Sequence, residues 1–193
     1  MATSHWSNAR PSRGGLLREG LAFDQCDVAI VTNLGGGDHL GLNYITTLED
    51  LQVLKRVIVL NVAPTGTAVL NAADPAVVAM APNCPGKVTF FAQDGHHPVI
   101  ETHRAQGQRV VFIDHCDIVC VEGAFMKRLP LARVPLTRKG QIGFPVENTM
   151  ASVAAAWALA TPWEALQKGL SSFISDLHGV PCRFNVFAPA RPT

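Results

Sequence analysis

One segment of the sequence joins a strand-like apolar run to side chains that can bind a metal ion. Residues 27–33 (DVAIVTN) are short and nearly all apolar, and residues 34–39 (LGGGDH) follow with three glycines and an Asp-His pair. Buried strands of parallel sheets have this composition, and open α/β sheets bind ligands just beyond the carboxyl ends of their strands. The imidazole of His39 can ligate a divalent cation there, with Asp38 orienting the ring. The alternative is a polar turn that carries a surface histidine.

The glycine-rich turn is not a phosphate-binding P-loop. The pattern GxxxxGK[ST], whose backbone N–H groups cradle phosphates, occurs nowhere in the 193 residues. A complete nucleotide-hydrolysing site is therefore not expected within this sequence.

Charge and composition limit the classes of partner. The 16 Lys and Arg residues nearly balance the 15 Asp and Glu residues, which gives a net charge of +1. Such a chain lacks the basic field that holds nucleic acid or an anionic membrane surface. The longest apolar run, residues 153–160, is far shorter than the roughly 20 residues that span a bilayer. Charged residues make up 16% of the sequence, against about 25% in ordinary soluble domains, so we expect an apolar surface that contacts another chain.

The cysteine pattern indicates reduced thiols. The five cysteines stand at positions 26, 84, 116, 120 and 182, and no two have CxxC spacing. An odd number without metal-ligand spacing argues against a disulfide framework or a zinc site. A reducing, cytoplasmic location fits this pattern.

Strand and helix patterns alternate in the first half of the sequence. Short apolar strands are predicted at 27–33, 68–71 and 87–92. Thr46 and Glu49 form a capping box that begins a helix reaching about Val59. Asp74, which precedes a proline, caps a short helix through Ala81. This alternation predicts an α/β fold with a mostly parallel sheet flanked by helices.

The second half changes to a different pattern. Three β runs at 109–114, 117–121 and 129–136 predict a small antiparallel β insertion attached to the parallel sheet. An alanine-rich helix follows over 146–159. Thr161 and Glu164 form a second capping box, which predicts a further helix to about residue 173.

An ordered series of motifs resembles the cyanophycin synthetases. Residues 13–24 (RGGLLREGLAFD) are similar to the segment ARGGILREGLxFD of that family. Further matches follow in the family's order, at 26–33, 37–41, 54–57, 61–64, 68–72, 84–87, 134–137, 142–144, 146–148 and 183–186. The series resembles the ATP-binding middle domain in the Mur-ligase-like half of these enzymes.

The resemblance implies an ATP-dependent amide ligase. Such enzymes phosphorylate a carboxylate to an acyl phosphate, which an amine then attacks. In cyanophycin synthetases this half is expected to add arginine to the aspartate side chains of poly-aspartate, the backbone of cyanophycin. ATP and Mg²⁺ are the implied cofactors, since phosphate transfer needs cations that neutralise the developing charge.

Two implied site residues concern the metal. His39 matches the Mur-type histidine that binds the second magnesium, and Lys55 falls where Mur ligases carry a lysine, often carbamylated, beside that metal. If the layout is retained, both side chains point into one cleft at the carboxyl ends of the strands. The alternative for Lys55 is an ordinary solvent-facing helix lysine.

Four further residues match nucleotide or substrate positions. Asn148 matches the asparagine that contacts the nucleotide base, and its alternative is a helix N-cap. Arg183 matches an arginine that reaches ATP phosphate, and it is otherwise a surface charge. Arg13 and Arg18 are candidates for contacting an acidic polymer, or are part of an ordinary surface loop.

The departures from the family shape the remaining expectations. Arg10 stands where the family has a magnesium-binding glutamate, Ala73 replaces an acidic residue, and the family's GTNGKT-type loop would precede residue 1.

We therefore expect an unstructured lead-in over 1–12, a partial Mur-ligase-like middle domain over 13–182, and the start of a C-terminal ligase domain over 183–193. We expect this chain to be inactive alone. Two alternatives stay open: a non-catalytic module that pairs with itself or with a full-length ligase, or one half of a split ligase.

Overall fold

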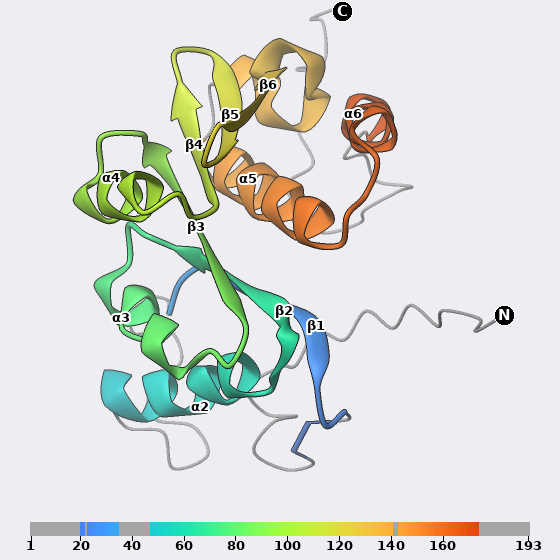
Figure 1. The fold of residues 1–193 in the computed structure, drawn as a ribbon. Coiled ribbons are helices and arrows are strands. Elements are labelled where there is room, and N and C mark those ends of the chain that lie inside the picture. Colours follow the sequence, from blue (N-terminus) through green and yellow to red (C-terminus); the bar gives the residue numbers. More distant parts are fainter. Residues whose placement is uncertain (1–19, 22, 35–46, 141–142, 174–193) are drawn as a thin grey trace, which may run out of the picture.

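A single six-stranded sheet organises the part of the chain that the computed structural model describes, residues 20–21, 23–34, 47–140 and 143–173 (Figure 1). The strands are β1 (Cys26–Val31), β2 (Val62–Asn71), β3 (Lys87–Asp94), β4 (Val110–Asp114), β5 (Asp117–Glu122) and β6 (Phe125–Pro130). They lie side by side in chain order. β1 to β4 are parallel, and β5 and β6 continue the sheet as antiparallel neighbours.

Helices cover both faces of the sheet (Figure 1). One face packs against α2 (Leu48–Leu60), α3 (Pro75–Val78) and α4 (Pro98–Ala105). The other packs against α5 (Gly143–Ala158), beside which lies α6 (Trp163–Ser172). Along β2, for example, Ala68 and Leu70 face the first layer and Val69 faces the second. Successive side chains alternate between the faces, so burial on both sides explains why these strands are continuous apolar runs.

The predicted fold class is confirmed, with one correction to its antiparallel part. The antiparallel strands are an extension at one side of the main sheet. The strand expected at 129–136 is wrong, because β6 ends at Pro130 and two 3₁₀ segments follow, η2 (Leu131–Arg133) and η3 (Pro135–Gly140). Leu131 and Val134 are both buried at the three-residue spacing that a 3₁₀ turn places on one side. The Thr137 hydroxyl donates to both of their carbonyls, at 3.2 and 2.9 Å.

Helix starts also differ from the sequence expectations. The first capping box lies one residue later than predicted: the Thr47 hydroxyl accepts from Asp50 N, and the Asp50 carboxylate accepts from Thr47 N. The second predicted box is wrong, because Pro162 occupies the N-cap of α6 and makes no side-chain cap hydrogen bond. The Asp74 cap is confirmed, although α3 is shorter than expected and a 3₁₀ turn, η1 (Ala81–Asn83), follows it.

Several sequence predictions fall outside the described residues. They concern the lead-in over 1–12, the arginines Arg13 and Arg18, the metal candidate His39, and the segment 183–193 with Arg183. Among the described helices, none has the length and apolar character needed to cross a lipid bilayer.

Candidate site at the carboxyl edge

Polar side chains collect where the parallel strands end. β1 is followed by Asn33 and Leu34, β2 ends at Asn71, and β3 ends at Asp94, directly after Gln93. We call this end of β1 to β3 the carboxyl edge. It is the position at which open α/β sheets bind ligands.

Lys55 reaches the carboxyl edge from α2. Its Nζ donates to the carbonyl oxygens of Asn33 at 2.8 Å and Leu34 at 3.3 Å. The side chain is half-buried, and this desolvation lowers the pKa of Lys55, while the nearby Asp74 carboxylate partly opposes the shift. Lys55 is therefore not the open, solvent-facing lysine of the alternative interpretation.

Asp74 holds the same stretch of backbone from the other side. One carboxylate oxygen accepts from Ala76 N at 3.0 Å and Val77 N at 3.4 Å, as an N-cap of α3. The other accepts from Leu34 N at 2.9 Å. The N–H of Leu34 is thus bound by Asp74 and its carbonyl by Lys55, which fixes the backbone just beyond β1.

The turn after β2 is built around a buried amide. Asn71 is only 5% exposed, and its Oδ1 accepts from Ala73 N at 2.9 Å. This bond leads the chain from β2 directly into the Asp74 cap. Asn71 and Asp74 therefore shape the loop that faces Lys55.

Asn148 approaches the carboxyl edge from the opposite layer. It is exposed and lies inside α5, five residues after the helix begins at Gly143, so the N-cap alternative is wrong. Its neighbour Glu147 accepts a hydrogen bond from Gln93 Nε2 at 3.0 Å. This contact places the turn that carries Asn148 beside the end of β3. Sequence reasoning missed the pair, because 54 residues separate its members and neither carries a local motif.

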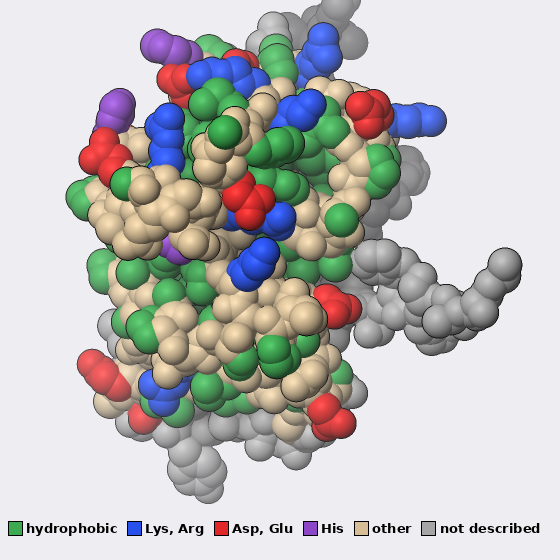
Figure 2. Space-filling view, viewed as in Figure 1, with side chains coloured by type: hydrophobic (Ala, Val, Ile, Leu, Met, Phe, Trp, Pro, Cys, Tyr) green, Lys and Arg blue, Asp and Glu red, His purple; other side chains and the backbone are tan. Residues whose placement is uncertain are grey.

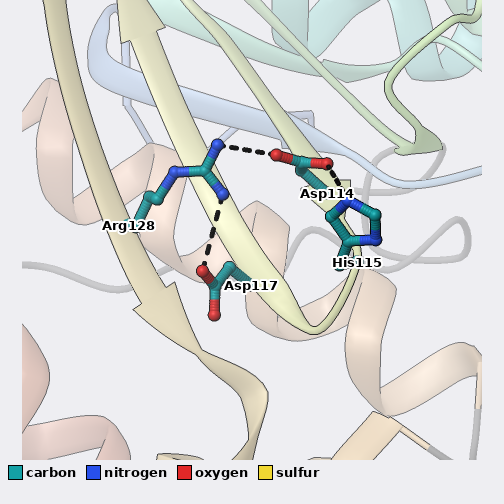
Figure 3. A network of polar contacts seen from close by, with 4 residues as sticks. All are labelled: Asp114, His115, Asp117 and Arg128. Atoms are coloured by element: carbon teal, nitrogen blue, oxygen red, sulfur yellow. Dashed lines mark hydrogen bonds and ion pairs between the residues drawn. The ribbon is translucent and has the colours of Figure 1, made fainter.

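A second group that sequence reasoning missed lies at the end of β4 (Figure 3). The Arg128 guanidinium bridges the Asp114 carboxylate at 2.6 Å and the Asp117 carboxylate at 3.5 Å, and His115 lies 3.7 Å from Asp114. The hydrogen bond from Arg128 lowers the pKa of Asp114. Opposite charges on adjacent strands, Arg128 on β6 and Asp117 on β5, are the signal that could have predicted it.

The described residues do not form a metal site by themselves. They contain no group of three or more His, Cys, Asp or Glu side chains that could hold an ion. The Lys55 ammonium is occupied as a donor to two carbonyls. His39, the candidate metal ligand from the sequence, lies outside the described residues.

Comparison with known protein families shows to which family the chain belongs. Residues 14–156 match the model of the Mur ligase middle domain. The chain belongs to this family. The middle domain is 37% identical over 177 residues to cyanophycin synthetase of Synechocystis sp., which covers 91% of this chain and 20% of that protein. For cyanophycin synthetase of Crocosphaera subtropica the identity is 38% with the same coverage. The resemblance drawn from the motifs is thus confirmed, and the chain spans about a fifth of the length of these relatives.

Solved structures support the fold of this middle domain. A crystal structure of MurF from Acinetobacter baumannii superposes with a TM-score of 0.55 at 19% identity, covering 88% of this chain and 33% of that one. A second crystal structure of the same enzyme gives 0.52 at 21% identity. At this identity the likeness concerns the fold alone.

Proposed function

We propose that this Mur ligase middle domain supplies the nucleotide-binding side of an ATP-dependent amide ligase of the cyanophycin synthetase type. One observation carries the proposal. Lys55 from one helical layer bonds the backbone just beyond β1, and Glu147, the neighbour of Asn148 in the other layer, accepts from Gln93 near the end of β3; β2 lies between these two strands. A ligand that lies across the end of β2 would contact both layers.

The proposed roles follow from the resemblance and from this placement. Asn148, an exposed carboxamide, binds the nucleotide base. Lys55 positions the backbone beyond β1, from which His39 contributes to binding Mg²⁺, and Arg183 contacts phosphate. Bound Mg²⁺ would neutralise charge on the phosphate groups during transfer to a carboxylate. The acceptor in this proposal is an aspartate side chain of poly-aspartate, which Arg13 and Arg18 help to hold, and the incoming amine is arginine.

Binding of ATP to the purified chain tests the proposal. Calorimetric titration with and without Mg²⁺ should show binding that Asn148→Ala weakens about tenfold, the effect of losing roughly 1.4 kcal/mol of hydrogen bonding. Asn83→Ala is the matched control, since Asn83 is the same residue type in η1, just before β3 begins. Absence of binding under both conditions would contradict the proposal.

A specific observation also favours the interaction module. Both outer strands carry exposed apolar side chains: Ile30 on β1 is 43% exposed, and Phe125 and Met126 on β6 are 44% and 47% exposed. Figure 2 shows hydrophobic side chains at the surface over β5 and β6, with charged side chains around them. Outer strands with free backbone groups favour pairing with another chain. Sedimentation over a range of concentrations tests this, and a compact monomer at every concentration would contradict self-association.

A further inference from the structure

The helix α2 carries apolar side chains on two opposite sides. Its inner side, with Leu51 and Val59, is buried against the sheet. On the outer side Val53 is 52% exposed, the largest exposed fraction among the large apolar side chains that the structure describes, and Leu60 is 46% exposed. A helix that packs only on a sheet needs one apolar side, so the second side favours contact with another chain.

Two opposite charges flank Val53 on this outer side. Glu49 precedes Val53 by four residues and Arg56 follows it by three, and side chains at these spacings are neighbours on a helix surface. Glu49 is exposed and Arg56 is half-buried. We call Glu49, Val53, Arg56 and Leu60 the α2 outer face.

Neither charge of the α2 outer face is neutralised within the described part of the chain. No hydrogen bond or ion pair joins Glu49 or Arg56 to another described residue, and the Arg56 Nε is buried without a hydrogen-bond partner. The two side chains cannot meet within one helix, because seven residues separate them by about 10 Å at 1.5 Å per residue. Both are therefore available to a second molecule.

The α2 outer face is complementary to a second copy of itself. A two-fold axis at Val53 sets the two helices antiparallel, with Val53 of each copy against the other. Arg56 then lies about 4.5 Å along the helix from the axis, and Glu49 of the other copy lies about 6 Å from it in the same direction. Their long side chains can meet across the roughly 8–10 Å that separates packed helices. The same ion pair forms twice, once on each side of the axis.

The outer strands lack this complementarity to their own copies. The strand β1 carries Asp27 and no basic residue, whereas β6 carries Lys127 and Arg128 and no acidic residue. A two-fold interface joins the same surface of both copies, so it needs both charges on one element. Only α2 among these three elements provides them.

We infer that two copies of this chain pair through the α2 outer face, as antiparallel helices joined by reciprocal ion pairs between Glu49 and Arg56. This inference rests on the interaction module proposed above and deepens it; it does not depend on the ligase. A single helix contact is smaller than a standard interface of about 800 Å² per partner. The dimer should therefore be weak and depend on protein concentration.

Sedimentation equilibrium of the full chain tests the contact. Val53→Glu should raise the dissociation constant of the dimer about tenfold, because like charges then meet at the axis. Met126→Glu is the matched control, since Met126 is similarly exposed, at 47%, on β6, and it should leave the constant unchanged. Thermal unfolding of each variant at low concentration shows whether the fold is retained.

An exchange of charges tests the antiparallel arrangement. Glu49→Arg and Arg56→Glu should each weaken the dimer, because each places like charges opposite one another. The double variant restores opposite charges and should recover the wild-type dissociation constant. If it does not recover although Val53→Glu weakens the dimer, the arrangement is overturned.

The remaining outcomes separate this inference from the earlier proposals. If Met126→Glu weakens the dimer and Val53→Glu does not, the α2 contact is overturned while self-association stands. If the wild-type chain is a monomer at every concentration, the inference and self-association both fail. The ligase proposal is then still decided by the binding of ATP.

Discussion

The carboxyl edge and the β4–β6 hairpins use polar side chains in opposite ways. At the carboxyl edge, Lys55, Asn71 and Asp74 each bind backbone groups, and they do so from half-buried or buried positions. In the hairpins, Arg128 and Asp114 bind each other, with 45% and 36% of their side chains exposed. The first arrangement fixes the course of loops, while the second links neighbouring strands at the surface.

The difference indicates which region can hold a ligand in place. A backbone group removed from water needs its partner, because an unpaired buried donor or acceptor costs more than a hydrogen bond gains. An exposed ion pair competes with water and salt, and it contributes little to stability. The described backbone at the carboxyl edge is therefore held by specific partners, which suits a binding site, whereas the hairpin network can change without disturbing the sheet.

The largest effect is expected from Asp74→Ala. The substitution removes the N-cap of α3 and leaves Leu34 N without its acceptor. Together these losses should lower the free energy of unfolding by about 2 to 3 kcal/mol, measured by urea denaturation. Asp94→Ala is the matched control, because the exposed Asp94 carboxylate accepts from His96 N, two residues away. Equal losses in the two variants would contradict the role given to the bonds of Asp74 with α3 and Leu34.

Local sequence signals predict much of the carboxyl edge. The Asp74-Pro75 pair is itself a signal for a helix N-cap. The apolar runs of β1, β2 and β3 are continuous, whereas a strand with one exposed face alternates apolar and polar residues. These signals act over a few residues, so they can be recognised without tertiary information. The resemblance then identified Lys55 and Asn148 as candidates, but it could not say that Lys55 bonds the backbone just beyond β1 or that Asn148 lies within α5.

Other features depend on contacts that the sequence does not display. Thr46-Thr47 and Glu49-Asp50 offer two overlapping capping boxes, and the structure contains the second. The apolar residues of 129–136 fit a strand or a 3₁₀ segment equally well, and the Thr137 hydroxyl bonds accompany the latter. The Arg128 network depends on the register of β5 with β6, so the opposite charges of Asp117 and Arg128 indicate it only once the two strands are paired.

An intermediate loss of unfolding free energy is expected from Lys55→Met at the carboxyl edge. It keeps the aliphatic stem and removes the ammonium that bonds Asn33 and Leu34. We expect a loss of about 1 to 2 kcal/mol, because partial exposure and the cost of desolvation reduce the value of a charged donor. Lys87→Met is the control, since Lys87 is exposed at the start of β3. A loss no larger than that of the control would show that the bonds to Asn33 and Leu34 are dispensable.

The difference in stability between the wild-type chain and Lys55→Met should change with pH in a defined direction. Desolvation lowers the pKa of Lys55 in the folded state. Between that lowered value and the ordinary lysine pKa of about 10.4, the unfolded chain binds more protons, so stability rises with pH. The difference in unfolding free energy between wild type and Lys55→Met should therefore increase as the pH approaches this upper value. A difference that is flat across this range would contradict the placement of the ammonium.

The smallest effect is expected from Arg128→Met in the hairpin network. The Arg128 guanidinium lowers the pKa of Asp114, so the pair stabilises the fold above the ordinary pKa of an aspartate. This contribution is lost as the pH falls through the lowered value, because the carboxylate becomes protonated. The stability difference between wild type and Arg128→Met should therefore be small at neutral pH, shrink with added salt, and vanish in acid. Lys127→Met, on the same exposed strand, controls for loss of a positive charge. A difference that persists in acid, or one as large as that of Asp74→Ala, would show that Arg128 stabilises the hairpins mainly by packing rather than by its charge.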